Sequence, residues 1–177
     1  MFQKGMIMSN SAVLPIATVG EKILAQHAQA VTVFDVSIQS LADDMLTTML
    51  AANGVGIAAP QVFSSAAMFI MASRPNPRYP DAPNMRPVVV INPRILETST
   101  QMELAEEGCL SIPDQRVKIW RHAQIKVQYH DLNGNLISDI LVGFVARIFQ
   151  HEFDHIQGIT LLERSNMPEQ QRPDTVN

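Results

Sequence analysis

Two histidines and a glutamate in the C-terminal part of the chain have the spacing of a metal-binding motif, HEFDH. On an α-helix, side chains four residues apart lie one turn apart on the same side, so His151 and His155 can bind one metal ion. Glu152 then lies beside the metal as a proton acceptor. Phe144 and Ile148 share the histidine stripe, which favours a buried metal site over a solvated helix face.

A catalytic metal site commonly has three protein ligands and a water molecule, so two histidines leave one ligand to be found. Cys109 is the first candidate, because a mixed thiolate and imidazole site suits zinc or ferrous iron. Glu163 is the second, as a downstream carboxylate of the kind that other zinc peptidases use. The residues alone leave two further interpretations of Cys109 open, a small buried apolar side chain and a nucleophile activated by a histidine.

A third segment, GVGIAAPQ at residues 54–61, contains two glycines that let the backbone turn sharply and approach another group closely. No Gly-Lys-Ser/Thr follows, so the segment is not a phosphate-binding loop. Gln61 at its end is an uncharged donor that can hold a carbonyl oxygen. Taken alone, the glycine pair is also consistent with a simple turn.

Hydrophobic periodicity predicts the elements that must position these segments. Apolar residues at spacings of three and four predict a helix over 37–52, with Asn53-Gly54 as its C-cap. A second helix is expected from Val142 onward and carries HEFDH, and Asn133-Gly134 predicts a hairpin turn before it. The prolines between residues 74 and 87 predict an exposed loop, and the fold class is α+β. Strands are expected at 66–72, 88–92, 94–98, 123–130 and 136–141.

The composition is that of one folded domain. The chain has 177 residues, 46% of them hydrophobic and 17% charged, which excludes a disordered chain. A net charge of −4 gives no basic patch for DNA, and the single cysteine excludes an intrachain disulfide and favours a reducing compartment. The uncharged run over 45–73 is broken by Gly, Pro and Asn, so we expect a soluble protein with a buried helix, turn and strand here instead of a membrane span.

Together, the three segments resemble the signature of the peptide deformylase family. The chain has GVGIAAPQ at 54–61, EGCLS at 107–111 and QHEFDHIQG at 150–158, in the order that the family shows. The resemblance extends over residues 13–164 and includes the stretch VVVINPRILE. It implies a compact single α+β domain whose antiparallel sheets pack around the metal-binding helix. It also implies a metal-dependent hydrolase that removes the formyl group from the N-formylmethionine of new polypeptides and releases formate.

Carried over to this chain, the resemblance implies a set of three metal ligands with water in the fourth position, namely Cys109, His151 and His155. Glu152 would act first as general base and then as general acid. The side-chain amide of Gln61 and the backbone N–H of Leu110 would stabilise the oxyanion that forms when the formyl carbonyl is attacked.

Further residues are expected to contact the substrate or to orient the metal helix. Ordinary core packing, solvation or an exposed ion pair would explain the same residues as well. Arg116 is expected to contact the peptide backbone of the substrate. Arg121 is expected either to pair with Asp154 and orient the metal helix, or to form an exposed ion pair of little consequence. The apolar pocket for the methionine side chain is assigned to Val55, Gly56, Phe144 and Ile148.

One ferrous ion (Fe2+) per chain is the implied cofactor, and Zn2+, Ni2+ or Co2+ can substitute for it. The implied partners are N-formylmethionyl nascent polypeptides and the ribosome near the exit tunnel, with no DNA and no membrane. We expect a cytoplasmic monomer with a loose lead-in (1–11), a catalytic domain (12–166) and a short polar tail (167–177). Some family members dock on the ribosome through a longer C-terminal helix, so the short tail leaves docking open.

Three other functions stay open on the sequence alone. A metallopeptidase of the HExxH type would use the same helix without Cys109 as a ligand. A non-catalytic module that binds nascent chains would hold a structural metal, and such sites are usually closed by four protein ligands, whereas three convincing ligands are present here. An enzyme with a cysteine nucleophile would turn over in the presence of a chelator.

Overall fold

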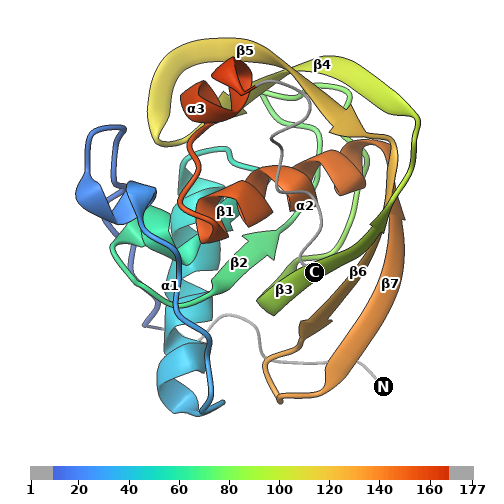
Figure 1. The fold of residues 1–177 in the computed structure, drawn as a ribbon. Helices are drawn as coiled ribbons and strands as arrows, with labels where there is room; N and C mark the ends of the chain where they lie inside the picture. The colour runs from blue at the N-terminus through green and yellow to red at the C-terminus, as the bar shows by residue number, and fades with distance from the viewer. Residues whose placement is uncertain (1–9, 168–177) are drawn as a thin grey trace.

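The structure is a computed structural model that describes residues 10–167 (Figure 1). Of the expected lead-in and tail, only residues 10, 11 and 167 lie within this part of the chain. Within it, no helix is long and apolar enough to cross a membrane. The elements in chain order are η1 (Lys22–Ala25), α1 (Val36–Ala51), β1 (Gly56–Ala58), η2 (Ala59–Val62), β2 (Met68–Met71), β3 (Val88–Thr98), β4 (Met102–Cys109), β5 (Ile112–His122), β6 (Gln124–His130), β7 (Leu136–Val142), α2 (Gly143–Ile156) and α3 (Leu161–Asn166).

The strands form two separate antiparallel sheets. The larger has five strands in the order β1-β2-β3-β6-β7, and the smaller is the hairpin β4–β5. Helix α1 covers one face of the larger sheet and α2 covers the other, and the hairpin arches over α2 (Figure 1). Strand β2 shows this layering, because Phe69 and Met71 pack in the core of α2, whereas Met68 and Ile70 pack in the core of α1. The expected α+β class, with antiparallel sheets around the motif helix, is confirmed.

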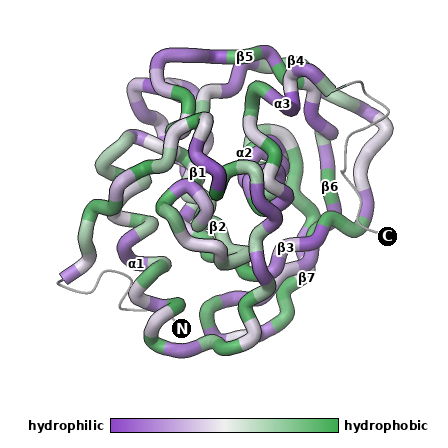
Figure 2. The backbone as a smooth tube through the Cα atoms, turned by 60° about the vertical axis from the view of Figure 1, so that its left-hand side comes forward, coloured by the Kyte–Doolittle hydropathy of each residue, from purple (hydrophilic) through white to green (hydrophobic). Residues whose placement is uncertain are grey.

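Apolar side chains fix α2 on the sheet. Phe149 and Phe153 are 0% and 1% exposed, and the Phe149 ring meets Phe69 of β2 edge-on with 5.0 Å between ring centroids. In Figure 2, hydrophilic and hydrophobic colours alternate along α2 although the helix lies in the middle of the molecule. The buried polar residues of α2 include Arg147, Gln150 and Asp154, and all three form hydrogen bonds with the hairpin.

The two predicted helices are confirmed. Helix α1 begins after Asp35, whose carboxylate accepts hydrogen bonds from the N–H groups of Ser37 and Ile38. It ends just before Asn53, which takes a positive φ of 55°. The turn predicted at Asn133-Gly134 joins β6 to β7, and Gly134 has a φ of 79° there.

Three features differ from the expected elements. The two strands expected at 88–92 and 94–98 are one strand, β3, because a shift of register at Asn92-Pro93 accommodates the proline without ending the strand. The hairpin β4–β5 is not predicted by the local sequence, since β4 (MELAEEGC) is rich in helix-favouring residues. Helix α3 is also additional, and a capping box between Thr160 and Glu163 starts it.

Candidate active site

The structure brings Cys109, His151 and His155 together although they come from two different elements. Cys109 is the last residue of β4, and the histidines lie one turn apart on α2. One ligand atom from each residue can be chosen so that all three lie within 4.8 Å of one another. The Cys109 Sγ atom is 3.3 Å from Nε2 of His155. All three residues are withdrawn from solvent, so the arrangement could hold a metal ion and is not a chance surface cluster.

Glu163, the other candidate for the third ligand, does not belong to this set. Its carboxylate accepts hydrogen bonds from the N–H and hydroxyl of Thr160, at 2.7 and 3.0 Å. The carboxylate is therefore used to cap α3, and the prediction of Glu163 as a ligand is wrong.

Glu107 orients the first histidine. Its Oε2 atom accepts a hydrogen bond from Nδ1 of His151 at 2.9 Å, so a proton of this imidazole is held on Nδ1 and Nε2 is directed toward the Cys109 thiol. Arg121 donates to both carboxylate oxygens of Glu107 at 2.9 Å, and Arg147 donates to Oε1 at 2.8 Å. Burial alone would raise the pKa of Glu107, but the Arg121 guanidinium and His151 outweigh it and hold this pKa far below its ordinary value.

The surroundings of Cys109 favour the thiolate form of its side chain. Burial raises the pKa of Cys109, but the neighbouring imidazoles of His155 and His151 lower it by more, and the pKa lies well below that of an ordinary thiol. A thiolate is the metal-binding state of cysteine, so the donor set suits a divalent cation such as iron, zinc, cobalt or nickel.

Glu152 is buried beside the metal donors with an unused oxygen. Among the described residues, no group hydrogen-bonds to its Oε2 atom. Burial raises the pKa of Glu152 to about 7, although the nearby His151 and His155 act in the opposite direction. A bound divalent cation would lower this pKa further toward the carboxylate form, which is the form that accepts a proton.

The predicted pair of Arg121 and Asp154 is present and buried. Nη1 of Arg121 donates to Oδ2 of Asp154 at 2.7 Å, and the two residues are 2% and 3% exposed, so the alternative of an exposed pair is wrong. Arg164 of α3 donates to both oxygens of the same carboxylate. A buried ion-pair network thus links Glu107 on the hairpin, through Arg121 and Asp154, to α3.

Gln61 lies within η2 with its side-chain amide aimed at the metal donors. Its Oε1 atom accepts from the N–H of Ala58 at 2.9 Å, which fixes the orientation of the amide. Its Nε2 atom donates to the hydroxyl of Ser111 at 3.0 Å and lies 3.6 Å from Sγ of Cys109. Ser111 and Leu110 form the turn of the hairpin, and Leu110 lines the same pocket.

The residues predicted to hold an apolar side chain share one pocket with the metal donors, as its lining includes Val55, Gly56, Phe144 and Ile148. Gly56 has a spatial requirement here, because a Cβ atom added to it would lie 2.3 Å from Oε1 of Glu152. The absence of a Cβ atom at Gly56 therefore leaves the space that the Glu152 carboxylate occupies.

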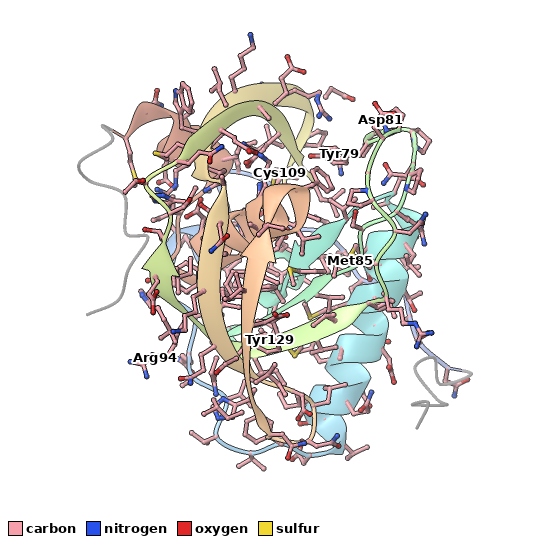
Figure 3. The ribbon with its side chains drawn as sticks, turned by 90° about the vertical axis from the view of Figure 1, so that its right-hand side faces the viewer. Tyr79, Asp81, Met85, Arg94, Cys109 and Tyr129 are labelled. Atoms are coloured by element: carbon pink, nitrogen blue, oxygen red, sulfur yellow. The ribbon has the colours of Figure 1, made fainter. Side chains whose placement is uncertain are left out.

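The proline-rich loop over 74–87 lines the pocket instead of lying free on the surface. The Tyr79 hydroxyl accepts from the N–H of Gly108 at 2.9 Å and donates to its carbonyl at 3.3 Å, which holds the loop beside Cys109 (Figure 3). Arg78 also lines the pocket. Arg116 lies at the rim outside it, with its guanidinium 4.8 Å from the centre of the Tyr79 ring.

Sequence reasoning missed three residues of the site, which are Glu107, Arg147 and Tyr79. Two of them carried a usable signal. Glu107 belongs to the EGCLS segment, and Arg147 lies one helical turn before His151 on the predicted metal-binding stripe. A charged residue in a stripe that is otherwise apolar needs a buried partner. Tyr79 had no comparable signal, because a loop position gives no periodicity.

A buried cysteine, two histidines on one helix and a neighbouring carboxylate with an unpartnered oxygen are the groups of a metal-dependent hydrolase of mixed cysteine and histidine ligation. Comparison with known families agrees with this class. The family model described as Polypeptide deformylase matches residues 13–171, and the chain belongs to that family.

Close relatives support the same assignment over nearly the whole chain. Peptide deformylase 2 of Shewanella oneidensis is 59% identical over 170 residues, which cover 96% of this chain and 94% of the relative. Peptide deformylase 2 of a Nostoc species is 51% identical, over 88% of this chain and 87% of the relative. Among solved structures, a class I type b peptide deformylase from Acinetobacter baumannii bound to Met-Ala-Ser superposes with a TM-score of 0.85 at 52% identity, covering 88% of this chain and 99% of that one.

The predicted family, activity and enzyme class are therefore confirmed. The chain is a metal-dependent hydrolase that removes the N-formyl group from the formylmethionine of nascent polypeptides and releases formate.

Proposed function

We propose that Cys109, His151 and His155 hold one Fe2+ ion for this reaction, and that Zn2+, Ni2+ or Co2+ can take its place. The observation that carries the assignment is the convergence of three buried donor atoms within 4.8 Å of one another. The donor set supports a divalent transition metal, and the choice of iron rests on the family resemblance. When bound, the cation supplies an activated water and polarises the formyl carbonyl.

Glu152 is the proton carrier of the proposed mechanism. Its buried and unpartnered Oε2 atom is free to take a proton from the attacking water. As the bond between the formyl carbon and the methionine nitrogen breaks, the same oxygen returns this proton to the leaving amine. One carboxylate thus acts as base and then as acid.

Gln61 and Leu110 hold the oxyanion in this proposal. The Gln61 amide is oriented in advance by Ala58 and Ser111, so its N–H donors need no reorganisation when negative charge develops on the formyl oxygen. The backbone N–H of Leu110, next to Cys109 in the hairpin turn, is the second donor.

The methionine side chain is proposed to enter the apolar pocket lined by Val55, Gly56, Phe144 and Ile148. The Acinetobacter baumannii relative bound to Met-Ala-Ser supports a peptide site that begins with methionine. Arg116, at the rim beside Tyr79, is placed where the peptide leaves the pocket and can contact its backbone.

We further propose a cytoplasmic monomer whose catalytic domain spans 12–166, flanked by a lead-in over 1–11 and a tail over 167–177. It would act on formylated chains near the ribosomal exit tunnel, because its substrate is the first residue of a chain that emerges there. The chain has a single cysteine and so no intrachain disulfide, which supports a reducing compartment.

The test is formate release from formyl-Met-Ala-Ser by anaerobically purified protein loaded with iron or nickel. We expect Glu152→Gln to lower kcat by about 10²–10⁴-fold, because general acid–base catalysis typically contributes that much. Glu97→Gln, which changes an exposed glutamate on β3, is the matched control and should keep full activity. Normal turnover by Glu152→Gln would remove Glu152 from the proposed role.

Cys109→Ala separates the proposed site from the peptidase alternative. We expect this variant to lose cobalt binding, measured as loss of the visible cobalt absorption. Retention of tightly bound cobalt by folded Cys109→Ala protein would contradict the proposed ligand set. Formate release that resists a chelator would instead support the cysteine-nucleophile alternative.

A further inference from the structure

Arg147 is a buried arginine that the mechanism does not use. It lies on α2 one turn before His151 and is 6% exposed. Its guanidinium has three acceptors, all on the hairpin β4–β5. Nη1 donates to Oε1 of Glu107 at 2.8 Å and to the carbonyl of Ile119 at 3.0 Å, and Nη2 donates to the carbonyl of Glu103 at 2.6 Å.

These contacts join the two parts of the molecule that supply the metal donors. The hairpin supplies Cys109, and α2 supplies both histidines. A shift of the hairpin relative to α2 would change the distances from the Cys109 sulfur to the two imidazoles. Metal affinity depends on these distances, because donor atoms must lie close to fixed separations from the ion.

Apolar packing does little to fix this relative position. Within residues 10–167, the apolar cluster at the hairpin consists of buried side chains of the hairpin and α3, with two partly buried ones against them: Cys109, Ile112, Ile119 and Leu161, then Val117 and Leu162. The core of α2, by contrast, lies on the five-stranded sheet. Directional hydrogen bonds therefore align the hairpin with the metal helix, and Arg147 supplies three of them beside the Arg121–Asp154 pair and the bonds between Gln150 and His122.

The arginine also acts on Glu107. Arg147 and Arg121 both donate to Oε1 of this carboxylate, which leaves Oε2 for Nδ1 of His151 and for the second bond from Arg121. With the guanidinium of Arg147 in place, the carboxylate is held in the orientation that fixes the His151 tautomer.

We propose that Arg147 is a positioning residue that sets the geometry of the three metal donors by fixing the hairpin against α2. The inference rests on the proposed ligand set but not on the identity of the substrate. Its readout is metal binding, so it can be tested whether or not the protein releases formate.

The experiment measures the dissociation constant of Co2+, by competition with a chelator, and the visible absorption of the cobalt protein. Arg147→Met keeps an unbranched apolar stem, shorter than that of arginine, and removes every donor. We expect cobalt binding about 10–100-fold weaker, the usual cost of losing a partner that orients a metal ligand, together with an altered cobalt spectrum. Arg147→Lys should recover part of the affinity, since an ammonium can reach one or two of the acceptors but lacks the planar fork.

Arg94→Met is the matched control, because Arg94 is an exposed arginine on β3 and points away from the site (Figure 3). If folded Arg147→Met binds cobalt as tightly as Arg94→Met and with the wild-type spectrum, the positioning role is wrong. If Arg147→Met does not fold, the decision passes to Arg147→Lys, whose wild-type affinity and spectrum would equally overturn it. Formate release is assayed in parallel, so wild-type protein that binds cobalt but releases no formate would contradict the proposed function alone.

Discussion

The two sides of the metal pocket are held in place by different forces. On one side, α2 is fixed to the five-stranded sheet by large buried apolar side chains such as Phe149, Phe153 and Phe69. On the other side, the hairpin is fixed to α2 and α3 by buried ion pairs that centre on Glu107 and Asp154. Apolar burial is strong but non-directional, whereas charge-assisted hydrogen bonds are directional and short.

This difference matches what each side contributes. The sheet and α2 supply most of the buried core, which supports folding. The hairpin contributes Cys109 and the Glu107 contact to His151, whose usefulness depends on orientation. Substitutions on the apolar side should therefore lower mainly the free energy of unfolding. Substitutions on the ionic side should weaken metal binding more than they lower the free energy of unfolding. Four substitutions test this contrast.

Phe149→Ala removes the ring at the centre of the apolar side. Phe149 is fully buried against Phe69, and truncation of such a phenylalanine costs about 3–5 kcal/mol of unfolding free energy, because the lost transfer energy adds to the cost of the cavity. The measurement is urea unfolding of the metal-loaded protein. Cobalt affinity at a temperature well below the transition should stay within a few-fold of wild type. A loss of affinity greater than that caused by Glu107→Gln, the next substitution, would contradict the assignment of stability to the apolar side and metal binding to the ionic side.

Glu107→Gln weakens the ionic side without changing its shape. We expect the unfolding free energy to fall by about 3 kcal/mol, because a neutral amide leaves the buried Arg147 guanidinium without a charge partner and Arg121 with Asp154 alone. The folded pKa of Glu107 is lowered, so the wild-type advantage is complete at neutral pH and shrinks as the pH falls below about 4.3, the ordinary glutamate value.

The same variant should bind cobalt about 10–100-fold more weakly, because the neutral amide does not hold the His151 proton as a carboxylate does. Unfolding curves recorded at pH 7 and at pH 4, together with cobalt titrations, measure both effects. A variant that loses stability but keeps wild-type cobalt affinity would show that the ionic side serves only to fold the chain.

The two sides also differ in how far the sequence predicted them. Helix α2 and its metal-binding stripe follow from local spacing, because each turn repeats the same apolar pattern and the motif occupies a single helix. The partners of Glu107 lie 14 to 44 residues away along the chain, and no local pattern encodes such pairs. Strand β4 even contradicts its own helix-favouring composition, because pairing with β5 and burial of its last residues decide its conformation.

Gly56→Ala tests how tightly the Glu152 carboxylate is enclosed on the apolar side. The added Cβ would lie 2.3 Å from Oε1 of Glu152, so either the glutamate or β1 must move, and overpacking of this kind typically costs about 1–3 kcal/mol. The displaced carboxylate should also lower kcat in the formate assay more than it changes KM. The stability cost should largely vanish when Glu152→Ala is present as well, because the colliding atoms are then gone. An unchanged cost in the double variant would mean that Gly56 is required for some reason other than room for Glu152.

Glu97→Gln gives the smallest expected effect and shows what burial adds to the ionic side. Glu97 pairs with Lys126 at 2.8 Å, much as Glu107 pairs with its arginines, but the two side chains are 69% and 44% exposed. Exposed pairs contribute less than about 1 kcal/mol, so we expect the free energy of unfolding to fall by less than that value.

This loss should shrink further when the salt concentration is raised toward about 1 M, because the Debye length falls to about 3 Å. The loss in Glu107→Gln should hardly change over the same range, since buried pairs are screened much less. Urea unfolding at low and high salt compares the two variants directly. Equal losses of unfolding free energy with equal salt dependence would show that burial does not distinguish the ion pairs of the hairpin from those of the surface.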